Sequence, residues 1–212
     1  MSSKSSFRDI ANIGMSDVVG TAISVIFWFY MATVMDPKQY GEIFFYIGIA
    51  TIGAGIALLA TQNSVIVYLG KKIPLQSTLY SFTLIAMIVG STVLILLFYQ
   101  LDLVLIFIAF VIHTMAIGNI LGRKKFSEYF KYNLTQKGLL LVLGIMFYNI
   151  FGVEGILYAL ACSYVFFIIQ VFRGIKSEPI NLSLFKNHLG FISNNYAFRV
   201  VQISKTQIDK LI

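Results

Sequence analysis

The residues of this chain that are best suited to bind a ligand form a polar stripe near its C-terminal end. Five polar side chains follow one another there at steps of four, three, four and three residues, namely Asn195, Arg199, Gln202, Thr206 and Asp209. At about 100° per residue these five positions lie on one face of an α-helix. Inside a bilayer an arginine or an aspartate is costly unless it faces a water-filled cavity or a partner. The stripe therefore predicts a helix that lines a cavity for a polar, anionic substrate.

A second interpretation of this segment is a peripheral amphipathic helix that lies in the membrane interface. Lys205 and Lys210 could reach the headgroups along such a helix, because long basic side chains extend from an apolar surface toward water. Interfacial helices usually carry their basic residues at the edges of a wide polar face, whereas Arg199 stands between Phe198 and Val200. This neighbourhood favours the cavity-lining interpretation.

Asp17 is the second candidate, because it is the one ionisable residue well inside the first apolar segment. Asn12, Ser16, Gly20 and Ser24 fall on the same half of a helix. One interpretation is a carboxylate that lines the cavity or carries a coupling proton or cation. The other is a structural carboxylate paired with a Lys or Arg of a neighbouring helix.

The elements that must position these residues are membrane-spanning helices. Of the 212 residues 58% are hydrophobic and 12% are charged, against about 25% charged in soluble domains. Apolar runs of about 20 residues match the thickness of a bilayer, and they do not alternate as barrel strands would. We expect spans at 11–35, 42–69, 78–99, 102–121, 134–151 and 153–173, and a more polar seventh at 189–212.

The distribution of basic residues predicts the orientation of these spans. Only Lys38 lies on one side, beside Asp36, Glu42, Asp102 and Glu154. Twelve basic residues are assigned to the other side: Lys4, Arg8, Lys71, Lys72, Arg123, Lys124, Lys125, Lys131, Lys137, Arg173, Lys176 and Lys186. Five of them, from Arg123 to Lys137, are counted as lying between the fourth and fifth spans. The positive-inside rule then predicts a multi-pass protein of the cell (cytoplasmic) membrane with its N-terminus in the cytoplasm.

Several other functions are not expected. The net charge of +7 and the aromatic residues interleaved in the basic segment 123–137 could suggest nucleic acid. A juxtamembrane helix resting on anionic lipid headgroups explains them better, so membrane lipids are the expected partners. No paired carboxylates or nucleophile–histidine motif emerges, and His113 has no second ligand at metal-binding spacing. We therefore expect neither an enzyme nor a cofactor or metal site.

Three short segments resemble the polysaccharide-flippase branch of the multidrug/oligosaccharidyl-lipid/polysaccharide exporter superfamily. The segment from Met35 to Phe44 is similar to the outer loop between the first two helices of that family, with its Asp-Pro step and Tyr-Gly pair. Gly152-Val153-Glu154-Gly155 is similar to its Gly-x-x-Gly entry into the sixth helix. The segment from Phe191 to Ile212 resembles its seventh helix, which opens the second half.

The resemblance implies an all-α integral membrane protein that translocates a polyprenyl-phosphate-linked oligosaccharide by alternating access. Residues 1–176 would form a six-helix lobe, 177–188 a cytoplasmic linker, and 189–212 the first helix of a second lobe that is missing. It assigns phosphate binding to Arg199, with Lys205 as a weaker candidate. Gln202, Asn195 and Asp17 complete the predicted substrate site.

Since family members have two lobes, the resemblance also implies a fragment that works with a second half-transporter or with a copy of itself. Two alternatives stay open. One is a multidrug/cation antiporter of the same fold, in which Asp17 carries the coupling ion, and the other is a non-transporting membrane scaffold of a glycan-assembly complex.

Overall fold

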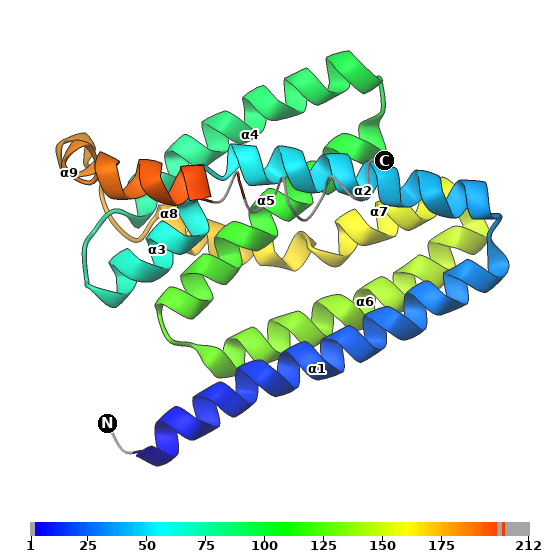
Figure 1. The fold of residues 1–212 in the computed structure, drawn as a ribbon, viewed down its shortest axis with the longest axis horizontal. Helices are drawn as coiled ribbons and strands as arrows, with labels where there is room; N and C mark the ends of the chain where they lie inside the picture. The colour runs from blue at the N-terminus through cyan, green and yellow to red at the C-terminus, as the bar shows by residue number, and fades with distance from the viewer. Residues whose placement is uncertain (1–2, 199–200, 202–212) are drawn as a thin grey trace.

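A computed structural model of the chain describes residues 3–198 and 201, and within this part the protein is an all-helical bundle (Figure 1). Residues 189–198 are also helical. The elements are α1 (Ser3–Val34), α2 (Pro37–Ala57), α3 (Thr61–Gly70), α4 (Gln76–Phe98), α5 (Leu101–Gly122), α6 (Phe126–Phe151), α7 (Val153–Ser163), the 3₁₀ turn η1 (Val165–Phe167), α8 (Ile168–Ile175) and α9 (Leu182–Asn187).

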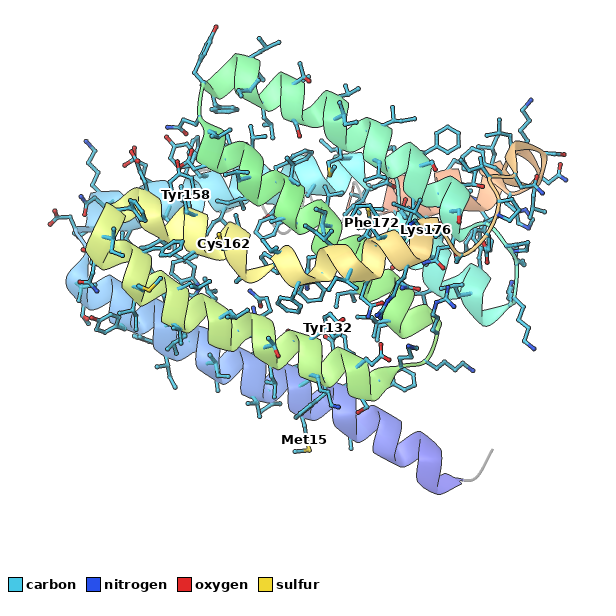
Figure 2. The ribbon with its side chains drawn as sticks, turned by 180° about the vertical axis from the view of Figure 1, so that it is seen from behind. Met15, Tyr132, Tyr158, Cys162, Phe172 and Lys176 are labelled. Carbon is cyan, nitrogen blue, oxygen red and sulfur yellow. The ribbon has the colours of Figure 1, made fainter. Side chains whose placement is uncertain are left out.

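Six helical segments are long and apolar enough to cross a membrane, which confirms the predicted six-helix lobe: Ile13–Val34, Pro37–Ala57, Gln76–Phe98, Leu101–Gly122, Phe126–Phe151 and Val153–Ile175. The sixth combines α7, η1 and α8. Large apolar side chains lie on the surface of these helices, as a lipid environment requires. Phe29 and Val18 are 71% and 70% exposed, and Met15 projects from α1 away from the bundle (Figure 2).

The bundle is organised around α5. This helix is apolar on all sides and is the most buried of the six, and it packs against α2, α3, α4, α7 and α8. The helices α1 and α6 run side by side and form one flank of the molecule (Figure 1). The α1–α2, α4–α5 and α6–α7 turns lie together at one end, which we call the acidic end because Asp36, Glu42, Asp102 and Glu154 are there. The opposite end is the basic end.

The predicted continuous span at 42–69 is wrong, because the structure divides it into α2 and α3. Leu59 and Ala60 adopt left-handed backbone conformations, with φ of 47° and 57°. A continuous helix of 28 residues would be about 42 Å long, which exceeds a hydrocarbon core of about 30 Å. The break turns α3 back onto α4 and α5, where the hydroxyls of Thr61 and Thr83 lie 2.6 Å apart.

The fifth span also differs from its prediction. Its helix begins at Phe126 rather than near residue 134, so the basic segment 126–137, expected as a juxtamembrane helix before the span, is the first half of α6 and continuous with it. A row of polar contacts with α1 holds this half in place. Asp17 accepts a hydrogen bond from the Tyr129 hydroxyl at 2.8 Å, and Asn133 donates to the Ser16 hydroxyl at 2.9 Å.

Candidate functional site

Lys137 is a cation near the middle of a membrane-spanning helix. It is the twelfth of the 26 residues of α6. At about 1.5 Å per residue its backbone lies about 17 Å from the start of the helix and about 21 Å from its end. In the described part of the chain, its side chain takes part in neither an ion pair nor a hydrogen bond. An ammonium group at this depth marks a candidate site by default.

Close packing between α1 and α6 positions this lysine. A Cβ atom at Gly20 would lie 3.2 Å from Asn133 Nδ2 and 3.4 Å from Lys137 Cγ. Glycine therefore lets the stem of Lys137 lie directly against the backbone of α1. One turn along, the Ser24 hydroxyl donates to the Gly20 carbonyl oxygen at 3.0 Å. This bond leaves the lone pairs of the Ser24 oxygen free to accept.

The Lys137 side chain lines an open cavity of about 440 Å³ between α1 and α2, which we call the Lys137 cavity. One row of α1 supplies its wall, at spacings of three and four residues that share a helix face. Two residues of α2 supply the other side. The full lining is Thr21, Ser24, Val25, Trp28, Phe29, Ala32, Tyr40, Phe44 and Lys137.

Three aromatic rings close the Lys137 cavity toward the acidic end. The ring centroids of Trp28 and Phe44 are 4.7 Å apart, those of Tyr40 and Phe44 are 4.9 Å apart, and Trp28 meets Tyr40 edge to face at 6.1 Å. Each aromatic pair of this kind contributes about 0.5–1.5 kcal/mol to packing. The cavity thus combines one cation, the hydroxyls of Thr21, Ser24 and Tyr40, and an aromatic wall, which suits a ligand that has both an anionic and a ring-shaped part.

Most of the substrate residues predicted from the sequence lie outside the described residues. Arg199, Gln202 and Lys205 do so, as do Thr206 and Asp209 of the same stripe. Asn195 lies within the described helical stretch 189–198. It is partly buried, and its Nδ2 atom is buried without a hydrogen-bond partner among the described residues.

Asp17 lies in the described part of the chain, so the surroundings of its side chain are known. Its side chain is exposed, and its recorded partner is the phenol of Tyr129 rather than the Lys or Arg that the structural interpretation expected. It does not line the Lys137 cavity. The Tyr129 contact links α1 to α6 near the basic end of the pair.

Sequence reasoning missed Lys137 because it counted this residue with the basic loop before the fifth span. A signal was present, since position 137 lies three residues inside the apolar run predicted at 134–151. A lysine there has to reach an interface or a cavity. The structure shows that Lys137 reaches a cavity.

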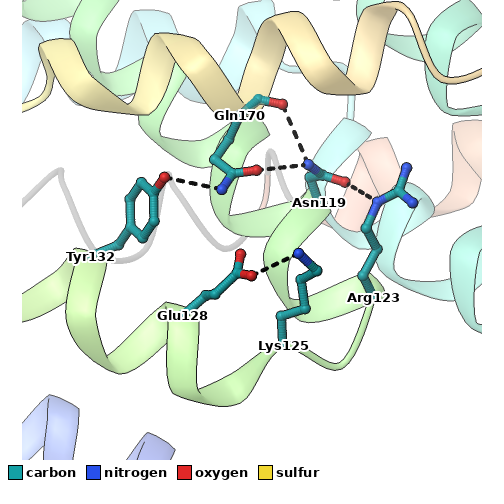
Figure 3. A network of polar contacts seen from close by, with 6 residues as sticks. All are labelled: Asn119, Arg123, Lys125, Glu128, Tyr132 and Gln170. Atoms are coloured by element: carbon teal, nitrogen blue, oxygen red, sulfur yellow. Dashed lines mark hydrogen bonds and ion pairs between the residues drawn. The ribbon is translucent and has the colours of Figure 1, made fainter.

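A second polar cluster lies among the helices at the basic end and holds them together (Figure 3). Asn119 Oδ1 accepts hydrogen bonds from Gln76 Nε2 at 3.0 Å and from Arg123 Nε at 2.6 Å. Its Nδ2 donates to Gln170 Oε1 at 3.3 Å, and Gln170 Nε2 donates to the Tyr132 hydroxyl at 3.1 Å. These contacts join α4, α5, α6 and α8. The groups satisfy one another, so we assign the cluster a structural role.

Comparisons of the chain with protein-family models, with curated proteins and with solved structures found no match.

Proposed function

We propose that this chain forms one lobe of a membrane transporter that translocates a polyprenyl-phosphate-linked oligosaccharide by alternating access. The observation that carries the proposal is the Lys137 cavity, in which a lysine near the middle of α6 reaches an open space between α1 and α2. An ammonium group offers three hydrogen-bond donors and no acceptor. It therefore complements a phosphate oxygen, and away from bulk water the attraction between the two charges is stronger.

The shape of the site also suits a ligand with three different parts. The phosphate would meet Lys137, while the hydroxyls of Thr21 and Ser24 are placed to bond sugar hydroxyls. The rings of Trp28 and Phe44 offer flat apolar surfaces to a sugar ring. Val25 and Phe29 are exposed at the side of α1, so a polyprenyl tail could stay in the hydrocarbon while its headgroup enters.

The proposal includes an orientation and a partner. The positive-inside pattern supports a cytoplasmic N-terminus and insertion in the cytoplasmic membrane. Alternating access requires a second wall facing α1 and α2, and a second lobe or a copy of this chain would supply it. The stripe of Arg199 would then add a further cation to the phosphate site.

A cation antiporter of the same fold is the second candidate. That mechanism needs a carboxylate that exchanges its ion with both sides of the membrane, and Asp17 is the candidate in α1. Its exposure favours this role, whereas its hydrogen bond to Tyr129 favours a structural one. The antiporter would be favoured over the flippase if Asp17→Asn abolished cation-coupled efflux and the wild-type chain bound no lipid-linked sugar.

Trp28 provides a direct test of the ligand class, because it is the one tryptophan of the chain and lines the Lys137 cavity. We expect a polyprenyl phosphate, titrated into nanodiscs that contain the protein, to change Trp28 fluorescence in a saturable way. The uncharged polyprenol of the same chain length is the control, and it should bind at least about tenfold more weakly, since a hydrogen bond to a charged group contributes about 1.5–3 kcal/mol. Equal responses to both lipids would contradict the proposal.

A further inference from the structure

A second cavity, of about 360 Å³, lies at the acidic end of the bundle and is separate from the Lys137 cavity. Polar side chains from the starts of α2, α5 and α7 line it, and they include three carboxylates. We call it the acidic-end pocket, and its polar lining includes Gln39, Glu42, Tyr46, Gln100, Asp102 and Glu154.

The position at a helix N-terminus explains why two of these residues are acidic, but it does not explain why one of them, Asp102, is buried. Asp102 and Glu154 are each the second residue of a helix, where acidic side chains offset the positive end of the helix dipole. Such acids normally remain in water. Asp102 is only 9% exposed, and it accepts a single hydrogen bond, from the Leu103 backbone N–H at 2.9 Å. Nowhere in the described chain does it form an ion pair.

Gln100, a partly buried residue at the start of α5, provides a second, independent observation at this pocket. Its Nε2 donates to the Tyr46 hydroxyl at 2.8 Å, which fixes the amide. Its Oε1 atom is buried and has no hydrogen-bond partner among the described residues. A buried carbonyl oxygen without a donor is costly. The pocket therefore holds a buried carboxylate without a counter-charge and a buried amide oxygen without a donor.

The groups that lack partners are acceptors, so the matching ligand is a donor with positive charge. Among the described residues, no group of three or more His, Cys, Asp or Glu side chains is placed to hold a metal ion, so the three carboxylates of this pocket do not converge on one point. A volume of about 360 Å³ belongs to small-molecule sites rather than to a single bare ion. A primary ammonium group has three N–H donors, no acceptor and a full charge.

We propose that the acidic-end pocket binds a primary ammonium group, with Asp102 and Gln100 as the deep acceptors and Glu42 and Glu154 as the outer charges. Since the pocket lies among the first turns of helices that span the membrane, it is at headgroup level. The ammonium can therefore come from an aminoethyl phospholipid headgroup or from a free amine. This site does not depend on the function proposed for the Lys137 cavity.

The test measures thermal stability of the full chain in phosphatidylcholine nanodiscs, with ethanolammonium chloride or choline chloride added at equal ionic strength. We expect a saturable rise in Tm with ethanolammonium and none with choline, whose quaternary nitrogen has no N–H donor. Asp102→Asn and Gln100→Leu should each weaken the ethanolammonium effect about tenfold or more. Asp36→Asn, an exposed acid at the same end that does not line the pocket, should leave it unchanged.

A second arm identifies the source of the ammonium. If the headgroup occupies the pocket, nanodiscs of phosphatidylethanolamine should raise the Tm of the wild-type chain and abolish the further effect of free ethanolammonium. An undiminished response would assign the pocket to free amines. Glu42→Gln, an exposed lining position, replaces Asp102→Asn if that variant does not fold. Equal shifts with choline, or shifts that the lining variants leave intact, would overturn the proposal, as would the lack of any shift in both arms.

Discussion

A Lys137→Gln variant is expected to bind polyprenyl phosphate at least about tenfold more weakly than the wild-type chain, with unchanged binding of the uncharged polyprenol. Glutamine keeps most of the length and two N–H donors of the side chain but removes its charge. A hydrogen bond to a charged group contributes about 1.5–3 kcal/mol, and 1.4 kcal/mol corresponds to a tenfold change in affinity. The Trp28 titration measures both affinities directly, because Trp28 and Lys137 line the same cavity.

Lys131 supplies a matched control on the same helix. It lies six residues before Lys137, is exposed, and does not line the cavity. Lys131→Gln removes the same charge from α6 and should leave the affinity for polyprenyl phosphate within about twofold of wild type, since exposed charges are screened. Lys137→Arg should retain binding. If Lys137→Gln and Lys131→Gln have the same affinity, Lys137 is not the phosphate-binding cation.

A Gly155→Ala variant is expected to be strongly destabilised. A Cβ atom at position 155 would overlap the carbonyl oxygen of Phe147 and lie 2.6 Å from its carbonyl carbon. These are backbone atoms of α6 and cannot rotate aside, so α7 would have to move away from α6. Overpacking typically costs about 1–3 kcal/mol and sometimes more. We expect the upper part of this range, measured as a lower midpoint of unfolding in denaturant.

Gly138 is the matched control for this substitution. It lies inside α6, where an added Cβ would meet no atom within 4 Å. Gly138→Ala should be neutral or stabilising by up to about 1 kcal/mol, because alanine favours a helix interior over glycine. The packing of α7 on α6 described here would be contradicted if both variants unfolded at the same denaturant concentration.

The contact at Gly155 shows what sequence reasoning could and could not establish. The Gly152–Gly155 pair was noticed as a family-like motif, and the structure supplies its physical reason. Gly152 adopts a φ of +67° in the turn between α6 and α7, and Gly155 lets the two helices touch. The hydrophobic runs predicted the first six of the seven expected spans because crossing a bilayer demands an apolar segment of a certain length.

The breaks and starts of helices were harder to predict. The turn at Leu59 and Ala60 carries neither glycine nor proline, so no turn residue marks its position. The length of the predicted span, 28 residues, was the one sign that a break was needed. The early start of α6 was missed because the basic residues were assigned outside the span, whereas contacts of Tyr129 and Asn133 with α1 hold them in one continuous helix with it. Helix propensity and charge are properties of a single segment, whereas the break before α3 and the start of α6 depend on contacts between two segments.

The candidate site depended on tertiary contacts even more. The sequence indicated cations in the membrane through the stripe of Arg199, and it placed Asp17 on α1. It could not show that Gly20 lets Lys137 pack against α1, or that Lys137 and Trp28 line the same cavity. Only the packing of α1 on α6 reveals that arrangement.

Photo-crosslinking in living cells tests the central claim most directly, because it identifies what occupies the Lys137 cavity. A photoreactive amino acid at Thr21 reports on the cavity, and one at Leu96, an exposed position on α4, reports on bulk lipid. We expect mass spectrometry to find a polyprenyl-phosphate-linked sugar attached at position 21 but not at position 96, and Lys137→Gln to reduce this adduct about tenfold. Adducts of ordinary phospholipids alone at both positions, unaffected by Lys137→Gln, would contradict the account.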